Sequence, residues 1–148
     1  MEIQKDFSEL FASLNAHDVE YIIVGGYALA FLGAPRFTGD IDVWVSTDRR
    51  NAERIIAALA DFGFSSVDLG IEDFQAADRV IQLGIPPVRI DFLTSLSGVS
   101  WQDAVTDAAA GYYGEIPVRY LGRSQFIANK RATGRRKDQA DLEALGEE

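Results

Sequence analysis

The sequence predicts an α/β fold of the α+β type, in which a mixed β-sheet carries helices mainly on one face. Apolar and polar residues alternate in segments 40–45 and 88–93, which is the period of a half-buried strand. Elsewhere apolar residues recur every three or four positions, as on one face of a helix. Helices and strands alternate only in part, so the other face of the sheet is expected to stay open for a substrate.

The first half of the chain begins with a helix, because the apolar residues between 7 and 14 fall at helical spacing. The β-rich segment 20–24 then ends at a diglycine, which a short helix follows. After the strand at 40–45, Thr47 or Asp48 is expected to cap a longer helix. Residues 65–78 carry no clear pattern and are interpreted as a candidate mobile flap.

In the second half, residues 79–83 and 88–93 are predicted strands joined by a turn at 84–87. Ser100 is the expected cap of the next helix. Residues 116–121 are predicted to form a short edge strand, because Pro117 has no N–H for a sheet ladder. Two tail helices follow, at about 124–133 and 136–145, separated by Gly134.

Length and composition indicate one globular domain, residues 1–148, including a helical tail at about 123–148. The chain has 148 residues, 47% of them hydrophobic, and no cysteine. It contains no apolar run of the roughly 20 residues that span a bilayer, and its N-terminus does not resemble a signal peptide. We therefore expect a cytoplasmic protein that does not bind membranes.

Three aspartates are the strongest functional signal in the sequence. Alternate residues of a strand share a face, so Asp40 and Asp42 project together. Asp91 lies in a second apolar strand, and if the two strands are neighbours the three carboxylates converge. Such a cluster is typical of a cation site, and oxygen ligands favour Mg²⁺ or Mn²⁺. The sequence thus predicts a metal site at Asp40, Asp42 and Asp91.

The diglycine Gly25-Gly26 adds a candidate phosphate site. Glycine lets the backbone approach phosphate oxygens closely, and the start of the following helix offers unpaired N–H donors. Many tight turns also contain two glycines, so this motif gains weight mainly from the Asp-x-Asp strand that follows it.

These residues resemble the signature of the nucleotidyltransferase superfamily related to DNA polymerase β. Gly25 and Gly26 match its glycine pair, although many relatives carry serine at the second position and therefore offer a hydroxyl there. Asp40, Asp42 and Asp91 match its three carboxylates. The chain looks most like small bacterial members related to minimal nucleotidyltransferases and abortive-infection-type toxins. Their tail motif is matched by Lys130, Gly134-Arg135-Arg136-Lys137-Asp138 and Asp141-Leu142-Glu143-Ala144-Leu145.

The resemblance implies an Mg²⁺-dependent transfer of a nucleoside monophosphate from a nucleoside triphosphate such as ATP to an acceptor hydroxyl, with release of pyrophosphate. Two metal ions would act, held by Asp40, Asp42 and Asp91. Asp91 would also accept the proton of the acceptor. Relatives modify RNA ends, proteins or small molecules, and some belong to toxin–antitoxin or phage-defence systems.

Candidate nucleotide contacts lie on both sides of the aspartates. Arg36 and Thr38 are expected to contact phosphates, with pairing of Arg36 to an aspartate as the alternative. Lys130, Arg135 and Lys137 belong to a basic cluster in a chain of net charge −9 and are predicted to hold the triphosphate. The alternative is that these tail residues only cap helices and pair with nearby aspartates.

Two other functions remain open from the sequence. One is a binding module of antitoxin type that has lost turnover, and the other is a metal-dependent phosphohydrolase. The chain shows no separate acceptor-binding domain, so a partner chain, a second copy or a large substrate is expected to complete the site. Trp44 shares the parity of Asp40 and Asp42 and is expected to flank the substrate.

Overall fold

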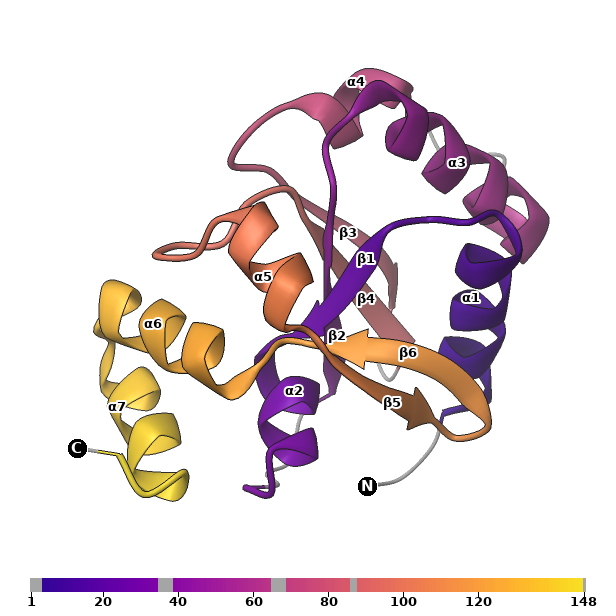
Figure 1. The fold of residues 1–148 in the computed structure, drawn as a ribbon. Coiled ribbons are helices and arrows are strands. Elements are labelled where there is room, and N and C mark those ends of the chain that lie inside the picture. The colour runs from indigo at the N-terminus through magenta and orange to yellow at the C-terminus, as the bar shows by residue number, and fades with distance from the viewer. Residues whose placement is uncertain (1–3, 35–38, 65–68, 86–87, 148) are drawn as a thin grey trace.

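Six strands form one mixed sheet in the computed structural model, which describes residues 4–34, 39–64, 69–85 and 88–147. The strand order is β3-β4-β2-β1-β6-β5; β2 and β4, and also β1 and β6, run parallel, and the other pairs are antiparallel (Figure 1). In chain order the elements are α1 Lys5–Ala16, β1 Tyr21–Val24, α2 Gly25–Phe31, β2 Asp40–Val45, α3 Arg49–Leu59, a π-helical turn Ala60–Phe64, α4 Ile71–Gln75, β3 Val80–Ile85, β4 Val88–Leu93, α5 Trp101–Asp107, β5 Ala109–Tyr113, β6 Ile116–Tyr120, α6 Arg123–Thr133 and α7 Arg136–Ala144.

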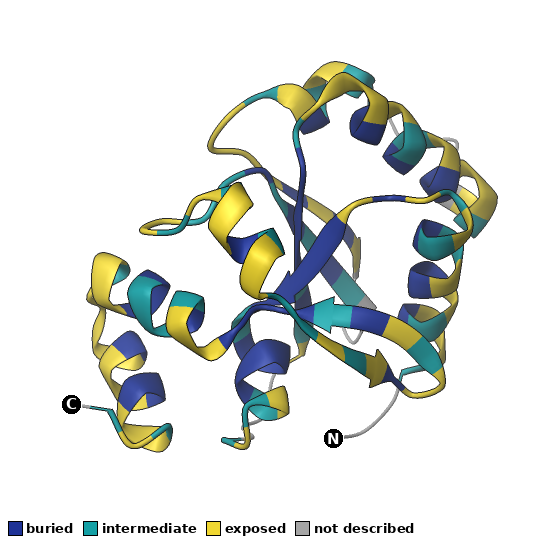
Figure 2. Ribbon diagram, in the orientation of Figure 1, coloured by how far each residue is buried: buried dark blue, intermediate teal, exposed yellow. Residues whose placement is uncertain are grey.

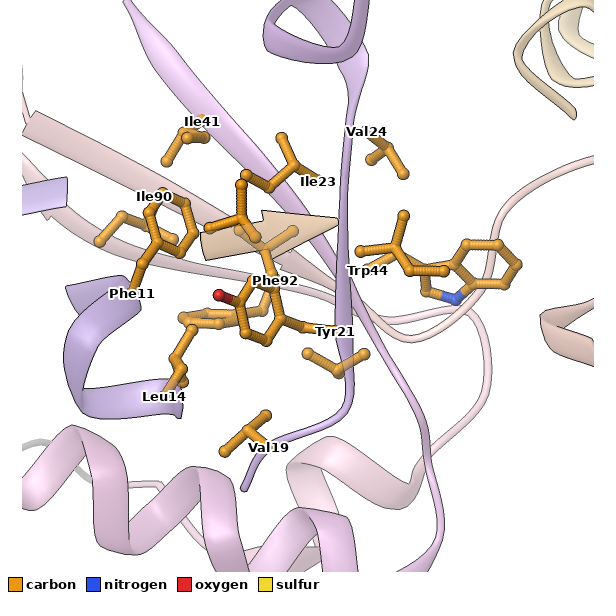
Figure 3. Close-up of a cluster of buried hydrophobic side chains, with 14 of the residues drawn as sticks. Phe11, Leu14, Val19, Tyr21, Ile23, Val24, Ile41, Trp44, Ile90 and Phe92 are labelled. Carbon is orange, nitrogen blue, oxygen red and sulfur yellow. The ribbon is translucent and has the colours of Figure 1, made fainter. Parts of the chain in front are cut away.

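One face of the sheet is fully apolar and packs against helices. Ile23, Val43 and Phe92 are register partners on β1, β2 and β4, so their side chains share this face. Phe74 of α4 packs edge-on against Phe92 with ring centroids 5.8 Å apart, and Phe11 of α1 lies in the same cluster (Figure 3). This layer is the main hydrophobic core, and it fixes β2 and β4 rigidly beneath the opposite face.

The opposite face carries the aspartates and is covered in part by α5. Trp44 packs edge-on against Trp101 of α5, with ring centroids 5.1 Å apart. Trp44 is only 3% exposed. The prediction that Trp44 flanks a substrate is therefore wrong, because the indole is buried beneath α5. The ribbon coloured by burial in Figure 2 shows buried strands at the centre and exposed residues along α5, α6 and α7.

Most predicted elements and their caps are confirmed. The Asp48 carboxylate accepts a hydrogen bond from the Asn51 backbone N–H at 2.8 Å and begins α3. The Ser100 hydroxyl accepts from the Asp103 N–H at 3.2 Å and begins α5. Gly134 ends α6 with φ of 60°, a left-handed conformation that glycine adopts without a Cβ clash. The two tail helices form as predicted.

The predicted edge strand at 116–121 is wrong in its position. β6 is internal, and the edge is formed by β5, which the sequence analysis did not predict. Pro117 is tolerated because β6 registers with β1 only at Ile23 and Tyr120, so its missing N–H faces no β1 partner. The Pro117 carbonyl instead accepts from the Asn15 side-chain amide at 2.8 Å.

Part of the segment predicted as a mobile flap is ordered against the core. Ile71–Gln75 forms α4, and its Phe74 is fully buried. Residues 65–68 of that segment lie outside the described residues. Within the described part of the chain, no helix has the length and apolar character to cross a bilayer.

Candidate active site

Asp42 and Asp91 lie directly opposite each other on the parallel strands β2 and β4. The predicted adjacency of these two strands is therefore confirmed. The Asp91 side chain is only 13% exposed, and its Oδ1 atom is buried and makes no hydrogen bond. A buried carboxylate oxygen without a donor is costly, so this geometry favours a bound cation or a shared proton.

The electrostatics of this pair are those of two crowded carboxylates. Burial raises the pKa of Asp42 to about 6, and the negative charges of Asp91 and Asp40 add to the rise. Burial also raises the pKa of Asp91, although the Arg89 guanidinium opposes this rise. The hydrogen bond between the two carboxyl groups raises the pKa of Asp42 and lowers that of Asp91, so a shared proton belongs mainly to Asp42.

Arg89 lies among the three aspartates. Its Nη2 donates to Asp40 Oδ2 at 2.5 Å, and its Nε lies 3.5 Å from Asp91 Oδ1. Asp40 and Arg89 are register partners, as Asp42 and Asp91 are one pleat further along. Within residues 4–34, 39–64, 69–85 and 88–147, no three Asp, Glu, His or Cys side chains are arranged to hold a metal ion together. The aspartates are thus neighbours, but Asp40 is turned towards a cation of the chain itself.

Gly25 lies directly against Asp42, one residue after β1 ends. A Cβ atom at this position would lie 2.2 Å from Asp42 Oδ2, and its φ of 67° is left-handed. Both facts require glycine here. Gly26 follows as a buried residue of α2. Gly25 therefore has a structural purpose beyond any contact with phosphate, since it makes room for the Asp42 carboxylate.

A cleft of about 360 Å³ opens beside Asp42 and Gly25. Lys130, Thr133 and Arg135 of the C-terminal helical segment form its basic wall. The other wall comes from the start of β3, the end of β4 and the loop after it. The residues of that wall are Asp78, Arg79, Val80, Leu93, Ser95, Leu96 and Ser97. One cleft thus joins an aspartate of the predicted site to three of the predicted nucleotide contacts, Gly25, Lys130 and Arg135.

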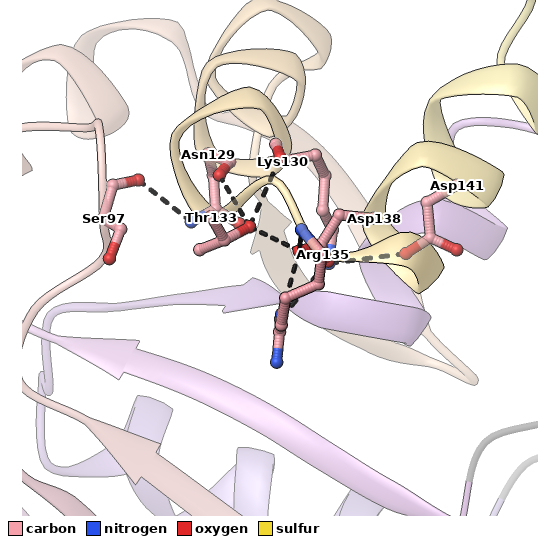
Figure 4. A network of polar contacts seen from close by, with 7 residues as sticks. All are labelled: Ser97, Asn129, Lys130, Thr133, Arg135, Asp138 and Asp141. Carbon is pink, nitrogen blue, oxygen red and sulfur yellow. Dashed lines mark hydrogen bonds and ion pairs between the residues drawn. The ribbon is translucent and has the colours of Figure 1, made fainter.

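A buried ionic network holds the basic wall in place (Figure 4). Lys130 is 6% exposed, and its ammonium lies 3.4 Å from both Asp138 and Asp141. Asp138 is fully buried and also accepts from Thr133 Oγ1 at 2.6 Å and from Arg135 Nε at 2.9 Å. These hydrogen bonds and the Lys130 charge outweigh burial and hold the pKa of Asp138 well below its usual value.

The remaining predicted contacts divide into three groups. Arg135 does cap α7 through Asp138, as the alternative reading expected, yet its side chain is 57% exposed and borders the cleft. Lys137 is exposed, and the described lining of this cleft does not include it. Arg36 and Thr38 lie outside the described residues, so their predicted phosphate contacts stay predictions.

Sequence reasoning missed the roles of Arg89 and Asp138. The signal for Arg89 was its spacing of two from Asp91, which places both side chains on one face of β4. The signal for Asp138 was its place three residues after Arg135, where the carboxylate accepts from the Arg135 N–H at 3.0 Å and closes the first turn of α7.

A sequence profile for aminoglycoside-2''-adenylyltransferases matches residues 6–114, which include the glycine pair and all three aspartates. The chain belongs to this family. The adenylyltransferase match ends at β5, so the C-terminal helical segment with Lys130 and Asp138 lies beyond it.

Two solved structures share the fold of this family member. A protein of Thermotoga maritima that has been assigned as a nucleotidyltransferase superposes with a TM-score of 0.60 at 14% identity, over 95% of this chain and 88% of its own. An antigenic nucleotidyltransferase-like protein from Paracoccidioides brasiliensis gives a TM-score of 0.52 at 22% identity, over 93% and 71% of the two chains. A search of curated proteins finds no match. The fold is therefore that of a small nucleotidyltransferase of the DNA polymerase β type.

Proposed function

We propose that this protein is an Mg²⁺-dependent nucleotidyltransferase that moves a nucleoside monophosphate from a nucleoside triphosphate, ATP first among them, to an acceptor hydroxyl. The carrying observation is the pair Asp42–Asp91, opposed on neighbouring strands with one buried oxygen that lacks a hydrogen-bond donor. The family supports the type of reaction, and the Asp42–Asp91 pair supports the position of the active site.

The donor set fits a hard divalent cation. Asp42 and Asp91 offer closely spaced carboxylate oxygens, and Asp40 lies one pleat away on the same face. These three residues would hold Mg²⁺, with Mn²⁺ as a substitute. When bound, the cation neutralises phosphate charge and lowers the barrier to displacement at phosphorus.

Other residues of this chain bind the triphosphate and accept the proton. Lys130 and Arg135 border the cleft and present positive charge to the triphosphate. The backbone at Gly25 borders the same cleft, so phosphate oxygens can approach it closely, and Gly26 lies buried behind it in α2. Asp91 accepts the proton of the acceptor hydroxyl. The hydroxyl oxygen then forms a bond to the α-phosphorus, the bond from that phosphorus to the bridging β-phosphate oxygen breaks, and pyrophosphate leaves with that oxygen.

A small cationic acceptor fits the charge of this protein better than RNA does. The net charge is −9, and Asp78 lines the cleft beside Arg79, on the wall that does not carry Lys130 and Arg135. RNA binding needs clustered Lys and Arg that neutralise phosphates, whereas an acidic surface attracts amines. The family name makes an aminoglycoside hydroxyl the first acceptor to test. RNA and protein acceptors, a cytoplasmic location and a place in toxin–antitoxin or phage-defence systems are retained as secondary proposals.

Release of pyrophosphate from ATP tests this function. The assay contains the protein, Mg²⁺ and separate acceptors: an aminoglycoside panel, total RNA, and cell protein. We expect acceptor-dependent release that Asp91→Asn abolishes. The control Glu115→Gln removes an exposed acid at the remote β5–β6 turn and should keep full activity. If no acceptor stimulates pyrophosphate release, the transferase proposal is wrong. ATP cleavage with water as the acceptor would then indicate a hydrolase, and no cleavage would indicate a binding module.

A further inference from the structure

The positively charged side chain of Arg89 lies among the carboxylates that are proposed to hold the metal. Its guanidinium is ion-paired with Asp40 and lies 3.5 Å from Asp91, and both strands carrying these residues are in the rigid centre of the sheet. The side chains of Arg89 and Asp40 are each 33% exposed. Arg89 is therefore close enough to solvent for its side chain to leave without unfolding the strand.

The pairing of Arg89 with the aspartates leaves two buried polar atoms without a hydrogen bond. Its Nε atom is buried and makes no hydrogen bond, and neither does the nearby Asp91 Oδ1 atom. This N–H and this carboxylate oxygen lie 3.5 Å apart and form an ion pair without a hydrogen bond, so burial costs each of them part of its solvation energy. In the second ionic network of the protein, Asp138 accepts hydrogen bonds from three neighbours.

From this we infer that Arg89 is a displaceable internal cation, which competes with the divalent metal for Asp40 and Asp91 and so keeps the metal-free site closed. The inference rests on the proposed function, because it assigns a role to Arg89 only if these carboxylates hold metal. It also accounts for the absence of a ready three-carboxylate metal site among the described residues, since Asp40 is turned towards Arg89.

The arrangement predicts that free metal binds weakly and that a metal–triphosphate complex binds well. A metal ion alone must break the Arg89–Asp40 ion pair and leave the guanidinium without a partner. A triphosphate brings anionic oxygens with which the released guanidinium can pair, as arginine does bidentately with phosphate. Arg89 thereby couples the arrival of metal to the arrival of nucleotide.

The test is Mn²⁺ binding without nucleotide, followed by electron paramagnetic resonance or calorimetry, for the wild type and Arg89→Gln. We expect the variant to bind Mn²⁺ about tenfold more tightly, because close charge pairs of this kind commonly couple by that much or more. With a non-hydrolysable ATP analogue present, the gain should shrink or reverse. The control Arg49→Gln removes an exposed cation of α3 that pairs with Glu53, and it should leave Mn²⁺ affinity unchanged.

A second variant keeps the test decisive if Arg89→Gln does not fold. Arg89→Lys retains the charge but loses the two-pronged pairing, so it should bind Mn²⁺ with an affinity between those expected for the wild type and the glutamine variant. Equal Mn²⁺ affinity in the wild type and both Arg89 variants would overturn the inference while leaving the metal site in place. Failure of every protein to bind Mn²⁺, with or without nucleotide, would overturn the proposed function as well.

Discussion

Replacing Asp42 by asparagine should stabilise the metal-free protein at neutral pH while abolishing its activity. Burial and the charges of Asp91 and Asp40 raise the pKa of Asp42 from 3.8 to about 6. A carboxyl group whose pKa is raised by folding stabilises the native state while it is protonated. This stabilisation is lost as the pH rises through the pKa of the group in the folded protein. The difference between the two pKa values corresponds to about 3 kcal/mol above pH 7.

The measurement is urea denaturation in EDTA at pH 4.0 and pH 7.5 for the wild type and Asp42→Asn. The amide keeps the shape that fits against Gly25 but carries no charge, so the variant should be more stable at pH 7.5 by up to about 3 kcal/mol. The two proteins should converge towards pH 4, where the wild-type carboxyl is protonated. Comparing the two curves cancels the contributions of titrating groups that do not interact with Asp42.

Asp138→Asn is the matched control with the opposite sign. Hydrogen bonds from Arg135 and Thr133 and the Lys130 charge lower the pKa of Asp138, so its charged form stabilises the fold at neutral pH. This variant should lose stability at pH 7.5, and the loss should diminish as the wild-type carboxylate protonates in acid. An Asp42→Asn protein that is no more stable than the wild type at pH 7.5 would refute the account of crowded carboxylates.

Three further predictions concern ligands and the backbone. Mg²⁺ or Mn²⁺ together with ATP should raise the melting temperature in thermal-shift measurements, since a ligand that binds only the native state stabilises it; no shift at millimolar ligand would contradict this. Alanine at both Arg135 and Lys137 should weaken nucleotide affinity and flatten its salt dependence while leaving metal affinity nearly unchanged; a loss of thermal stability with unchanged salt dependence would assign both residues to helix capping. Gly25→Ala should lower both stability and Mn²⁺ affinity, because its Cβ would displace Asp42. Gly134→Ala has a similar φ of 60°, but its Cβ would lie 3.7 Å from the Arg131 carbonyl oxygen, which is an ordinary contact, so this variant should lose stability alone.

The strands that carry Asp42 and Asp91 could be predicted from the sequence because strand parity and burial are local properties. Asp42 and Asp91 share a face since each alternates with apolar residues that the core requires, as Ile41 and Phe92 show. The importance of Gly25 could also be predicted from the sequence, although the structure shows that the nearby Asp42 carboxylate is what leaves no room for a Cβ there.

Features that depend on pairing across the fold were not readable from the sequence. β5 has the sequence Ala-Ala-Gly-Tyr-Tyr, whose alanines and glycine have low strand propensity, and it forms because β6 pairs with it. The burial of Trp44 depends on Trp101, which arrives from a helix far along the chain. The attachment of Arg89 to Asp40 likewise requires the parallel register of β2 and β4.

The most direct test of the central claim follows the two ends of the triphosphate separately. The protein is incubated with Mg²⁺, an acceptor that stimulates pyrophosphate release, and ATP labelled at either the α- or the γ-phosphate. Nucleotidyl transfer at Asp42 and Asp91 predicts that the α-label joins the acceptor while the γ-label leaves as pyrophosphate, and that Asp42→Asn transfers neither. Appearance of the γ-label on the acceptor or as free phosphate, or α-label transfer that survives Asp42→Asn, would contradict the account.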